Sequence, residues 1–311
     1  MTGVRIGIGV ALCSAAMSVA PAAQIPRPSG EPPGLVVDIG SHKMHLVCNG
    51  PAGARPVVIL EAGGGAYSTT WMPVQKALAT IVRSCAYDRG GSGWSEDGPA
   101  PRTMAQEVFE LHSLLVAAKI PGPYVMVGHS IGGLLVRLYA EKYPADVAGV
   151  VLAAAAHESA RLGVIGKGWV RVRELATGRP IPEPTATKRS GLPSSSSTPV
   201  DDLAEQFQVM YLARLRNREP LGNRPLIVLA PTRVDPAPPG TPDDLWRELR
   251  VEKDDQAMGL VLLSTNSKII RDPSSGHQIQ TDNPALVARA ITQVVEAVVK
   301  KTLLTDSIPR R

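Results

Sequence analysis

One stretch of the chain, residues 124–139, restricts the fold more than any other. It opens with the apolar run 124–127, which is typical of a short buried strand, and resumes after Ser130 as a helix-like segment. The turn between them has the pattern Gly-x-Ser-x-Gly at residues 128–132. A serine at so tight a turn is strained, and the flanking glycines leave no Cβ atoms to collide with strand or helix. The pattern predicts a nucleophile elbow that exposes Ser130 at the positive end of the following helix. A chance Gly/Ser-rich loop is the alternative, which the neighbouring strand and helix disfavour.

Around this stretch, apolar strand-like runs alternate with amphipathic helix-like segments. Residues 35–40 and 43–48 flank a Gly-Ser turn and predict an antiparallel hairpin. Alternation of this kind predicts an α/β fold with a doubly wound, mostly parallel sheet. Further strand-like runs are 56–61, 81–87, 146–153, 225–230 and 267–270, and the helix-like segments are 72–79, one capped by Thr103, 201–218, 241–249 and one that starts at 282–284.

The alternation stops in the middle of the chain. Residues 157–222 contain no apolar strand, and include the serine run 194–197 and the single good helix-like segment 201–218. We interpret residues 157–222 as a helical cap inserted over the sheet edge. The core then consists of residues 35–156 and 223–303.

The first residues are not expected to belong to the fold. Arg5 precedes the apolar run 6–20, which ends in an Ala-x-Ala site at residues 20–22. This is the layout of a secretory signal peptide over residues 1–23, and the run is too short for a comfortable membrane span. Residues 24–34 are proline-rich and predict an extended lead-in. We therefore expect an exported protein, periplasmic or extracellular, without a membrane span.

Charge and aromatic content bear on the partners. The chain of 311 residues carries a net charge of +5, but its Lys and Arg residues are scattered among acids and only 4% of residues are aromatic. Nucleic-acid binding needs a clustered basic surface with stacking aromatics, so we expect a small-molecule partner and no nucleic acid. The sequence predicts no particular oligomeric state.

Two cysteines, Cys48 and Cys85, remain after the expected signal cleavage. In an oxidising compartment two such residues are expected to pair as a disulfide. Two buried free thiols, behaving as small apolar side chains, are the alternative.

Four motifs in order resemble those of the α/β-hydrolase superfamily, over roughly residues 35–300. The second motif is similar to a loop common in esterases, lyases, dehalogenases and epoxide hydrolases of that superfamily. The resemblance implies a sheet of the α/β-hydrolase type, in which the second and fourth strands are neighbours, so that Cys48 would lie next to Cys85. The motifs are Glu-Ala-Gly-Gly-Gly at 61–65, Tyr-Asp-Arg-Gly-Gly-Ser-Gly-Trp-Ser at 87–95, Gly-His-Ser-Ile-Gly-Gly at 128–133 and Ser-Gly-His at 275–277.

The resemblance also suggests a nucleophile and a base. Similar epoxide hydrolases and dehalogenases use a carboxylate at the elbow, so Ser130 favours attack on a carbonyl carbon instead. His277 follows the last short strand and precedes the terminal helix, where superfamily members place their catalytic histidine. His157, just after a strand end, is the competing candidate.

The acid of the expected triad is less well marked. The favoured position lies in the loop after the strand 225–230, where Asp235 stands. Relatives with a similar Tyr-Asp-Arg loop often have Val-Asp at the end of the preceding core strand, but residues 153–154 are both Ala. This departure either gives the role to Asp235 or leaves the triad incomplete, and Glu158 is the outside candidate.

Two backbone N–H groups are expected to form the oxyanion hole. One is that of Ile131, and the other comes from the glycine loop, where Gly64 is the first candidate. Asp88 and Arg89 are expected to brace the floor of the site and not to act in catalysis.

These residues predict a secreted serine hydrolase that cleaves a carboxylic ester through an acyl-enzyme with a Ser-His-Asp triad, without a metal or cofactor. An amide, lactone or carbon–carbon bond hydrolase of the same fold would use the same triad and is one alternative. A weakly catalytic, ligand-binding relative is the other.

Overall fold

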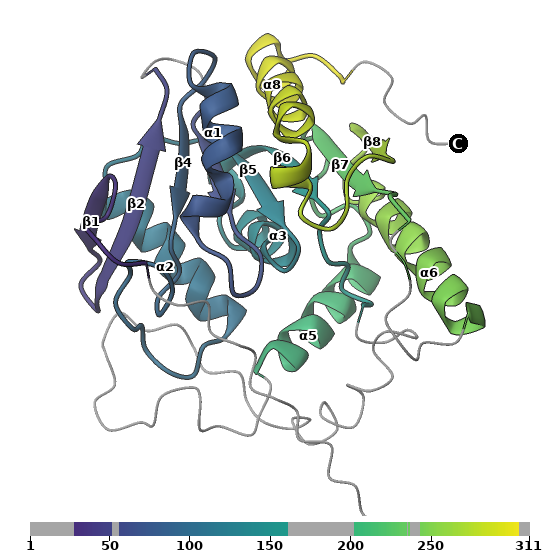
Figure 1. Cartoon of the computed structure of the whole chain (residues 1–311), viewed down its shortest axis with the longest axis horizontal. Coiled ribbons are helices and arrows are strands. Elements are labelled where there is room, and N and C mark those ends of the chain that lie inside the picture. The colour runs from purple at the N-terminus through teal and green to yellow at the C-terminus, as the bar shows by residue number, and fades with distance from the viewer. Residues whose placement is uncertain (1–27, 52–55, 161–201, 235, 237–242, 305–311) are drawn as a thin grey trace, which may run out of the picture.

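The structure, a computed structural model, describes residues 28–51, 56–160, 202–234, 236 and 243–304 (Figure 1). The expected signal peptide, most of the expected cap and Asp235 lie outside the described residues. Eight strands form one sheet in the order β1-β2-β4-β3-β5-β6-β7-β8. They are β1 Leu35–Asp38, β2 Lys43–Asn49, β3 Val58–Glu61, β4 Ser84–Tyr87, β5 Tyr124–His129, β6 Val147–Ala153, β7 Leu226–Pro231 and β8 Ser267–Asp272.

The sheet is doubly wound and mostly parallel, as the sequence predicts. Strand β2 pairs antiparallel with both β1 and β4, and every other neighbouring pair is parallel. The crossover order β4-β3-β5 places the elbow strand β5 in the middle of the sheet. The carboxyl end of a central parallel strand, where open α/β sheets bind ligands, is thus where Ser130 follows.

Helices cover both faces of the sheet (Figure 1). One apolar cluster packs α1 and α8 against one face, and a second packs α2 and α3 against the other. Side chains of β5 alternate between them, since Val125 and Val127 belong to the first cluster and Tyr124 and Met126 to the second. The helices are α1 Met72–Leu78, α2 Met104–Ala117, α3 Gly132–Lys142, α5 Asp202–Arg216, α6 Asp243–Val261, α7 Ile279–Asp282 and α8 Pro284–Lys300.

Helix boundaries follow the sequence signals at their starts better than at their ends. Thr103 caps α2 by accepting a hydrogen bond from the backbone N–H of Gln106, as expected. Helix α6 is longer than expected: the prediction ended it at residue 249, and it continues to Val261. Residues 250–258 are mostly charged and polar helix formers without Gly or Pro, so they extend the helix although they carry no clear apolar stripe. None of the helices described here is long and apolar enough to cross a membrane.

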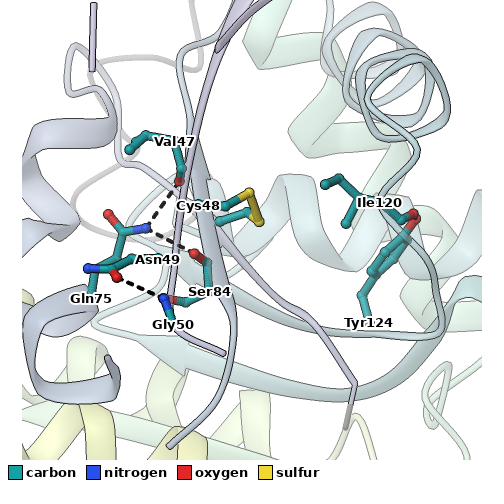
Figure 2. The surroundings of a disulfide bond; sticks show 9 residues. Val47, Cys48, Asn49, Gly50, Gln75, Ser84, Ile120 and Tyr124 are labelled. Atoms are coloured by element: carbon teal, nitrogen blue, oxygen red, sulfur yellow. Dashed lines mark hydrogen bonds between the residues drawn. A yellow bond between two sulfur atoms is a disulfide. The ribbon is translucent and has the colours of Figure 1, made fainter. Parts of the chain in front are cut away.

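A disulfide joins Cys48 to Cys85 across the antiparallel pair β2 and β4 (Figure 2). The two residues are direct register partners, as expected if the second and fourth strands are neighbours. The side chain of Gln75 lies alongside and donates to the carbonyl oxygens of Val47 and Ser84, each at 3.1 Å. Helix α1 and the two strands are thereby tied together at this edge of the sheet.

Removal of this disulfide is expected to lower the free energy of unfolding by about 2 to 4 kcal/mol, because it frees a loop of 37 residues in the unfolded chain. The double variant Cys48→Ala/Cys85→Ala avoids burying a new hydroxyl group at Cys85, which is fully buried. Urea titration followed by circular dichroism measures the change. The wild type in excess dithiothreitol should match the variant, and a loss below about 1 kcal/mol would contradict the prediction.

Candidate active site

The turn after β5 has the geometry of a nucleophile elbow. Ser130 has a φ of 54°, in the left-handed region that residues other than glycine rarely adopt. A Cβ atom at Gly128 would lie 2.4 Å from the carbonyl oxygen of Gly132, and one at Gly132 would lie 2.5 Å from that of Ala62. Both glycines are therefore required for strand, turn and helix to approach so closely.

The structure brings His277 to Ser130 from the far end of the chain. The His277 Nε2 atom lies 3.1 Å from the Ser130 Oγ atom, within hydrogen-bond range, although 147 residues separate them. Desolvation lowers the pKa of His277 from 6.5, and the positive charge of Lys253 lowers it further. The imidazole is therefore neutral near pH 7 and can accept a proton from the hydroxyl.

Two carboxylates shape the loop that carries His277. Asp272, at the end of β8, accepts hydrogen bonds from the hydroxyl groups of Ser274 at 2.7 Å and Ser275 at 2.5 Å. Burial alone would raise the pKa of Asp272, but these bonds lower it to about 2. Asp282 accepts at 2.8 Å from the backbone N–H of the residue before His277. Sequence reasoning placed Asp282 only at the start of the terminal helix and did not assign either residue to the site. The signal for Asp272 was an acid at the end of a strand.

His129 joins the elbow to the same loop. Its Nε2 atom lies 2.8 Å from the backbone carbonyl oxygen of His277, so Nε2 carries the proton and donates it. Burial lowers the pKa of His129 to about 4. A neutral His129 thus tethers the backbone of His277 beside Ser130, a role that the sequence did not indicate.

The competing histidine, His157, has other partners. Its Nδ1 atom lies 2.8 Å from Ser159 Oγ, and its Nε2 atom lies 3.6 Å from the Glu158 carboxylate. Burial lowers its pKa to about 4. These contacts join His157 to its own chain neighbours and not to Ser130.

Glu158, the outside candidate for the acid, holds helix α5 to the elbow helix α3. Its carboxylate lies 2.6 Å from Arg137 Nη1 on α3 and 3.4 Å from Arg214 Nε on α5. Burial would raise its pKa, but the charge of Arg137 holds the pKa below its usual value. These contacts explain the burial of Glu158 without a catalytic role.

Asp235 lies outside the described residues, but the chain just before it is described. Arg233 follows β7, and its backbone N–H donates to the carbonyl oxygen of Ser275 at 3.3 Å. Its guanidinium donates to the carbonyl oxygen of Ser274 at 3.3 Å and to Asp282 at 3.2 Å. Two residues before Asp235, the chain therefore runs against the loop of His277.

The glycine loop after β3 lies directly against the elbow. A Cβ atom at Gly63 would lie 3.2 Å from the Cβ atom of Ser130, and one at Gly64 would lie 3.6 Å from the side chain of Ile131. The structure thus brings Gly64 and Ile131, the two expected oxyanion-hole residues, together beside Ser130.

Arg89 lies beneath this loop and contacts its backbone. Its guanidinium donates to the carbonyl oxygens of Ala62 at 2.8 Å and Gly63 at 2.6 Å, and to the Glu61 carboxylate at 2.5 Å. Glu61 also accepts a hydrogen bond from the Tyr87 hydroxyl. The expectation that Arg89 braces the floor of the site agrees with these contacts.

Asp88 braces the neighbouring loop. It accepts hydrogen bonds from the backbone N–H groups of Ser68 at 2.7 Å and Trp94 at 2.9 Å, and from His45 Nδ1 at 2.9 Å. His45 Nε2 donates to the carbonyl oxygen of Pro33. Because both partners of His45 are acceptors, both ring nitrogens carry protons. Burial opposes the charged ring, but the hydrogen bonds prevail and raise the pKa of His45.

Comparison with known proteins agrees with this fold. The family described as "alpha/beta hydrolase fold" matches residues 56–260. The uncharacterized protein YqjL of Bacillus subtilis (strain 168) is 31% identical over 240 residues, which cover 76% of this chain and 82% of YqjL. Two other curated relatives are matched over only 18% and 23% of their own length.

Solved structures share the fold at low sequence identity. A thermophilic esterase from Thermogutta terrifontis has a TM-score of 0.55 at 20% identity, over 85% of this chain and 98% of the esterase. An enol-lactonase from Burkholderia xenovorans LB400 has a TM-score of 0.53 at 16% identity, over 82% of this chain and 97% of the lactonase. The matched family model covers more than half of the chain and shows that it belongs to the α/β-hydrolase family.

Proposed function

We propose that this protein is a serine hydrolase that cleaves a carboxylic ester through an acyl-enzyme, with Ser130 as nucleophile, His277 as base and Asp235 as the acid. One observation carries the proposal. The hydroxyl of Ser130 projects from a strained turn and lies 3.1 Å from an imidazole whose lowered pKa keeps it neutral. A nucleophile and a base in such contact are the minimal requirement for acyl transfer.

The proposed reaction has two similar halves. His277 Nε2 takes the proton of Ser130 as Oγ forms a bond to the ester carbon, and the carbonyl electron pair moves onto oxygen. The N–H groups of Gly64 and Ile131 stabilise this oxyanion. When the carbonyl reforms, the bond to the alkoxy group breaks, and His277 returns its proton to the departing alcohol. Water then attacks the acyl-enzyme by the same route and releases the acid.

An ester is proposed as substrate because an alkoxide is a weaker base than the amide anion or the carbanion that an amide or a carbon–carbon bond would release without protonation, so the alkoxide leaves a tetrahedral intermediate more readily. The esterase and lactonase named above share the fold alone with this chain, so their substrates carry no weight here. A p-nitrophenyl ester series, with a p-nitroanilide and a lactone in parallel, tests the bond class. Hydrolysis of the anilide or the lactone without hydrolysis of any ester would overturn the proposal.

Replacement of Asp235 by asparagine is expected to lower kcat by about 10⁴-fold, because an amide cannot hold the imidazole in the tautomer that accepts the serine proton. Support for Asp235 comes from Arg233, whose backbone and guanidinium contact the loop of His277. The measurement is steady-state hydrolysis of the best p-nitrophenyl ester.

The matched comparison is Glu158→Gln. It removes the charge that faces the buried Arg137, so a loss of about 3 to 5 kcal/mol in unfolding free energy is expected, with kcat changed less than about threefold in the folded fraction. A large loss of kcat in Glu158→Gln together with full activity in Asp235→Asn would assign the acid to Glu158.

We also propose that the protein is exported. The disulfide between Cys48 and Cys85 supports an oxidising compartment. Amino-terminal sequencing of the protein purified from its source tests this, and a mature chain that still begins at Met1 would contradict it.

A further inference from the structure

Arg89 holds two successive peptide groups of the glycine loop. Its Nη1 atom donates to the carbonyl oxygen of Ala62 at 2.8 Å, and its Nη2 atom donates to that of Gly63 at 2.6 Å. The carbonyl of Gly63 and the N–H of Gly64 belong to one planar peptide unit, in which the two groups point in opposite directions. The guanidinium therefore binds the reverse side of the very peptide whose N–H is proposed to receive the oxyanion.

The loop needs such support because it cannot be fixed by side chains of its own. Residues 63–65 are all glycine, and a Cβ atom at Gly63 would lie only 2.8 Å from the Nδ1 atom of His129. Glycine backbones have more conformational freedom than any other, so the direction of the Gly64 N–H depends on the bonds to the Gly63 carbonyl oxygen. The Ala66 N–H within the turn donates to this oxygen at 3.3 Å, and Arg89 donates to it at 2.6 Å. A planar guanidinium with a fixed fork of donors can hold two neighbouring carbonyls in one orientation.

The positive charge of Arg89 does not by itself explain how this residue would act on the reaction centre. The Glu61 carboxylate lies 2.5 Å from Nη1, and that of Glu107 lies 3.9 Å from Nε. The side chains of Arg89 and Glu61 are 10% and 1% exposed. The Glu61 carboxylate in contact with the guanidinium opposes its long-range field, so the direct hydrogen bonds to the loop are what reach the reaction centre. In such a site of low polarity, a charged donor on a carbonyl also polarises the N–H of the same peptide.

We propose that Arg89 is a positioning residue for the oxyanion hole, which orients and polarises the Gly63–Gly64 peptide so that the Gly64 N–H is aimed at the developing oxyanion before substrate binds. The inference rests on the proposed function and adds to it a residue that never touches the substrate. It acts on the transition state, where the negative charge forms, and hardly on the bound ester.

The variants Arg89→Met and Arg89→Lys test this, with Arg102→Met as the control. Arg102 is also a largely buried arginine, paired with Glu110 at 2.5 Å and within 3.9 Å of Glu107, but its described hydrogen bonds run to Glu110 and Pro99 and not to the glycine loop. We expect Arg89→Met to lower kcat by about 10²-fold, up to the loss seen when a whole oxyanion donor is removed, with KM within about threefold. Arg89→Lys should be intermediate, and Arg102→Met should keep kcat within about threefold.

A transition-state analogue separates positioning from general destabilisation. Binding of a trifluoromethyl ketone, which forms an oxyanion on Ser130, should weaken in Arg89→Met in proportion to kcat/KM. If Arg89→Met does not fold, Arg89→Lys, which keeps a cation beside Glu61, decides the question.

The possible outcomes distinguish this inference from the proposed function. Suppose that the wild type hydrolyses esters. If both Arg89 variants keep its kcat, or if Arg102→Met loses as much as Arg89→Met, the role of Arg89 is overturned and the ester hydrolase proposal stands. A wild-type protein that hydrolyses no ester and takes no phosphonate on Ser130 would overturn both.

Discussion

Replacement of Ser130 by alanine is expected to lower kcat for p-nitrophenyl esters by about 10⁶-fold, because it removes the hydroxyl that faces His277. The residual rate should come from the oxyanion donors and substrate binding alone. Affinity for a non-hydrolysable ester analogue should change little, since the variant removes one oxygen atom. Stopped-flow and overnight assays of the same preparation span this range.

A fluorophosphonate probe gives an independent measure of the same hydroxyl. Mass spectrometry of the wild type should find the label on Ser130, and Ser130→Ala should remain unlabelled. Ser274→Ala is a useful control, because Ser274 belongs to the loop of His277 but its hydroxyl donates to Asp272. A label on another serine, or ester hydrolysis that survives in Ser130→Ala, would contradict the role of Ser130 as nucleophile.

The fold was predictable from the sequence where local patterns dominate. The apolar run of β5, the glycines around Ser130 and the cap of α2 at Thr103 each depend on residues a few positions apart. Their periods and turn chemistry are visible without any tertiary information. The pairing of Cys48 with Cys85 needed one further step, the strand order that the resemblance implied.

The candidate site was predictable only in part, because much of it is held by backbone atoms. Arg89 binds carbonyl oxygens of the glycine loop, and His129 binds the carbonyl oxygen of His277. Every residue type has a carbonyl group, so no sequence pattern identifies these partners. The same holds for Asp282, whose acceptor oxygen meets a backbone N–H of the histidine loop.

The end of helix α6 was hard to predict from the sequence for a different reason. Its length depends on helix propensity over residues 250–258 and not on a regular apolar face. A surface helix of this kind gives a weak periodic signal, so its end was predicted about three turns too early.

Replacement of His277 by alanine is expected to lower kcat by about 10⁵- to 10⁶-fold, close to the effect of Ser130→Ala, since nucleophile and base act as one unit. For the same reason the double variant should be little worse than either single one. All rates are measured at pH 8, so that acid denaturation of a variant does not contribute to its loss of kcat.

The pH dependence gives a second readout of His277. Only the neutral imidazole can accept the serine proton, so kcat/KM should be full above the pKa of His277 and should fall as the pH drops through it. Desolvation, and then the charge of Lys253, place that pKa below 6.5. Because desolvation is the larger cause and Lys253 is exposed, added salt should move the midpoint only slightly upward.

The matched control for His277→Ala is His157→Gln. His157 follows β6 and is the histidine that competes with His277 for the role of base, and its described partners are Ser159 and Glu158. We expect this variant to keep kcat within about threefold, even if the folded protein becomes less stable. The fall of kcat/KM at low pH, which is its acid limb, should also remain. Loss of that limb in His157→Gln, with a normal profile in His277→Ala, would transfer the base to His157. That result would also require a rearrangement of the elbow, because in the present geometry the Ser130 hydroxyl faces His277.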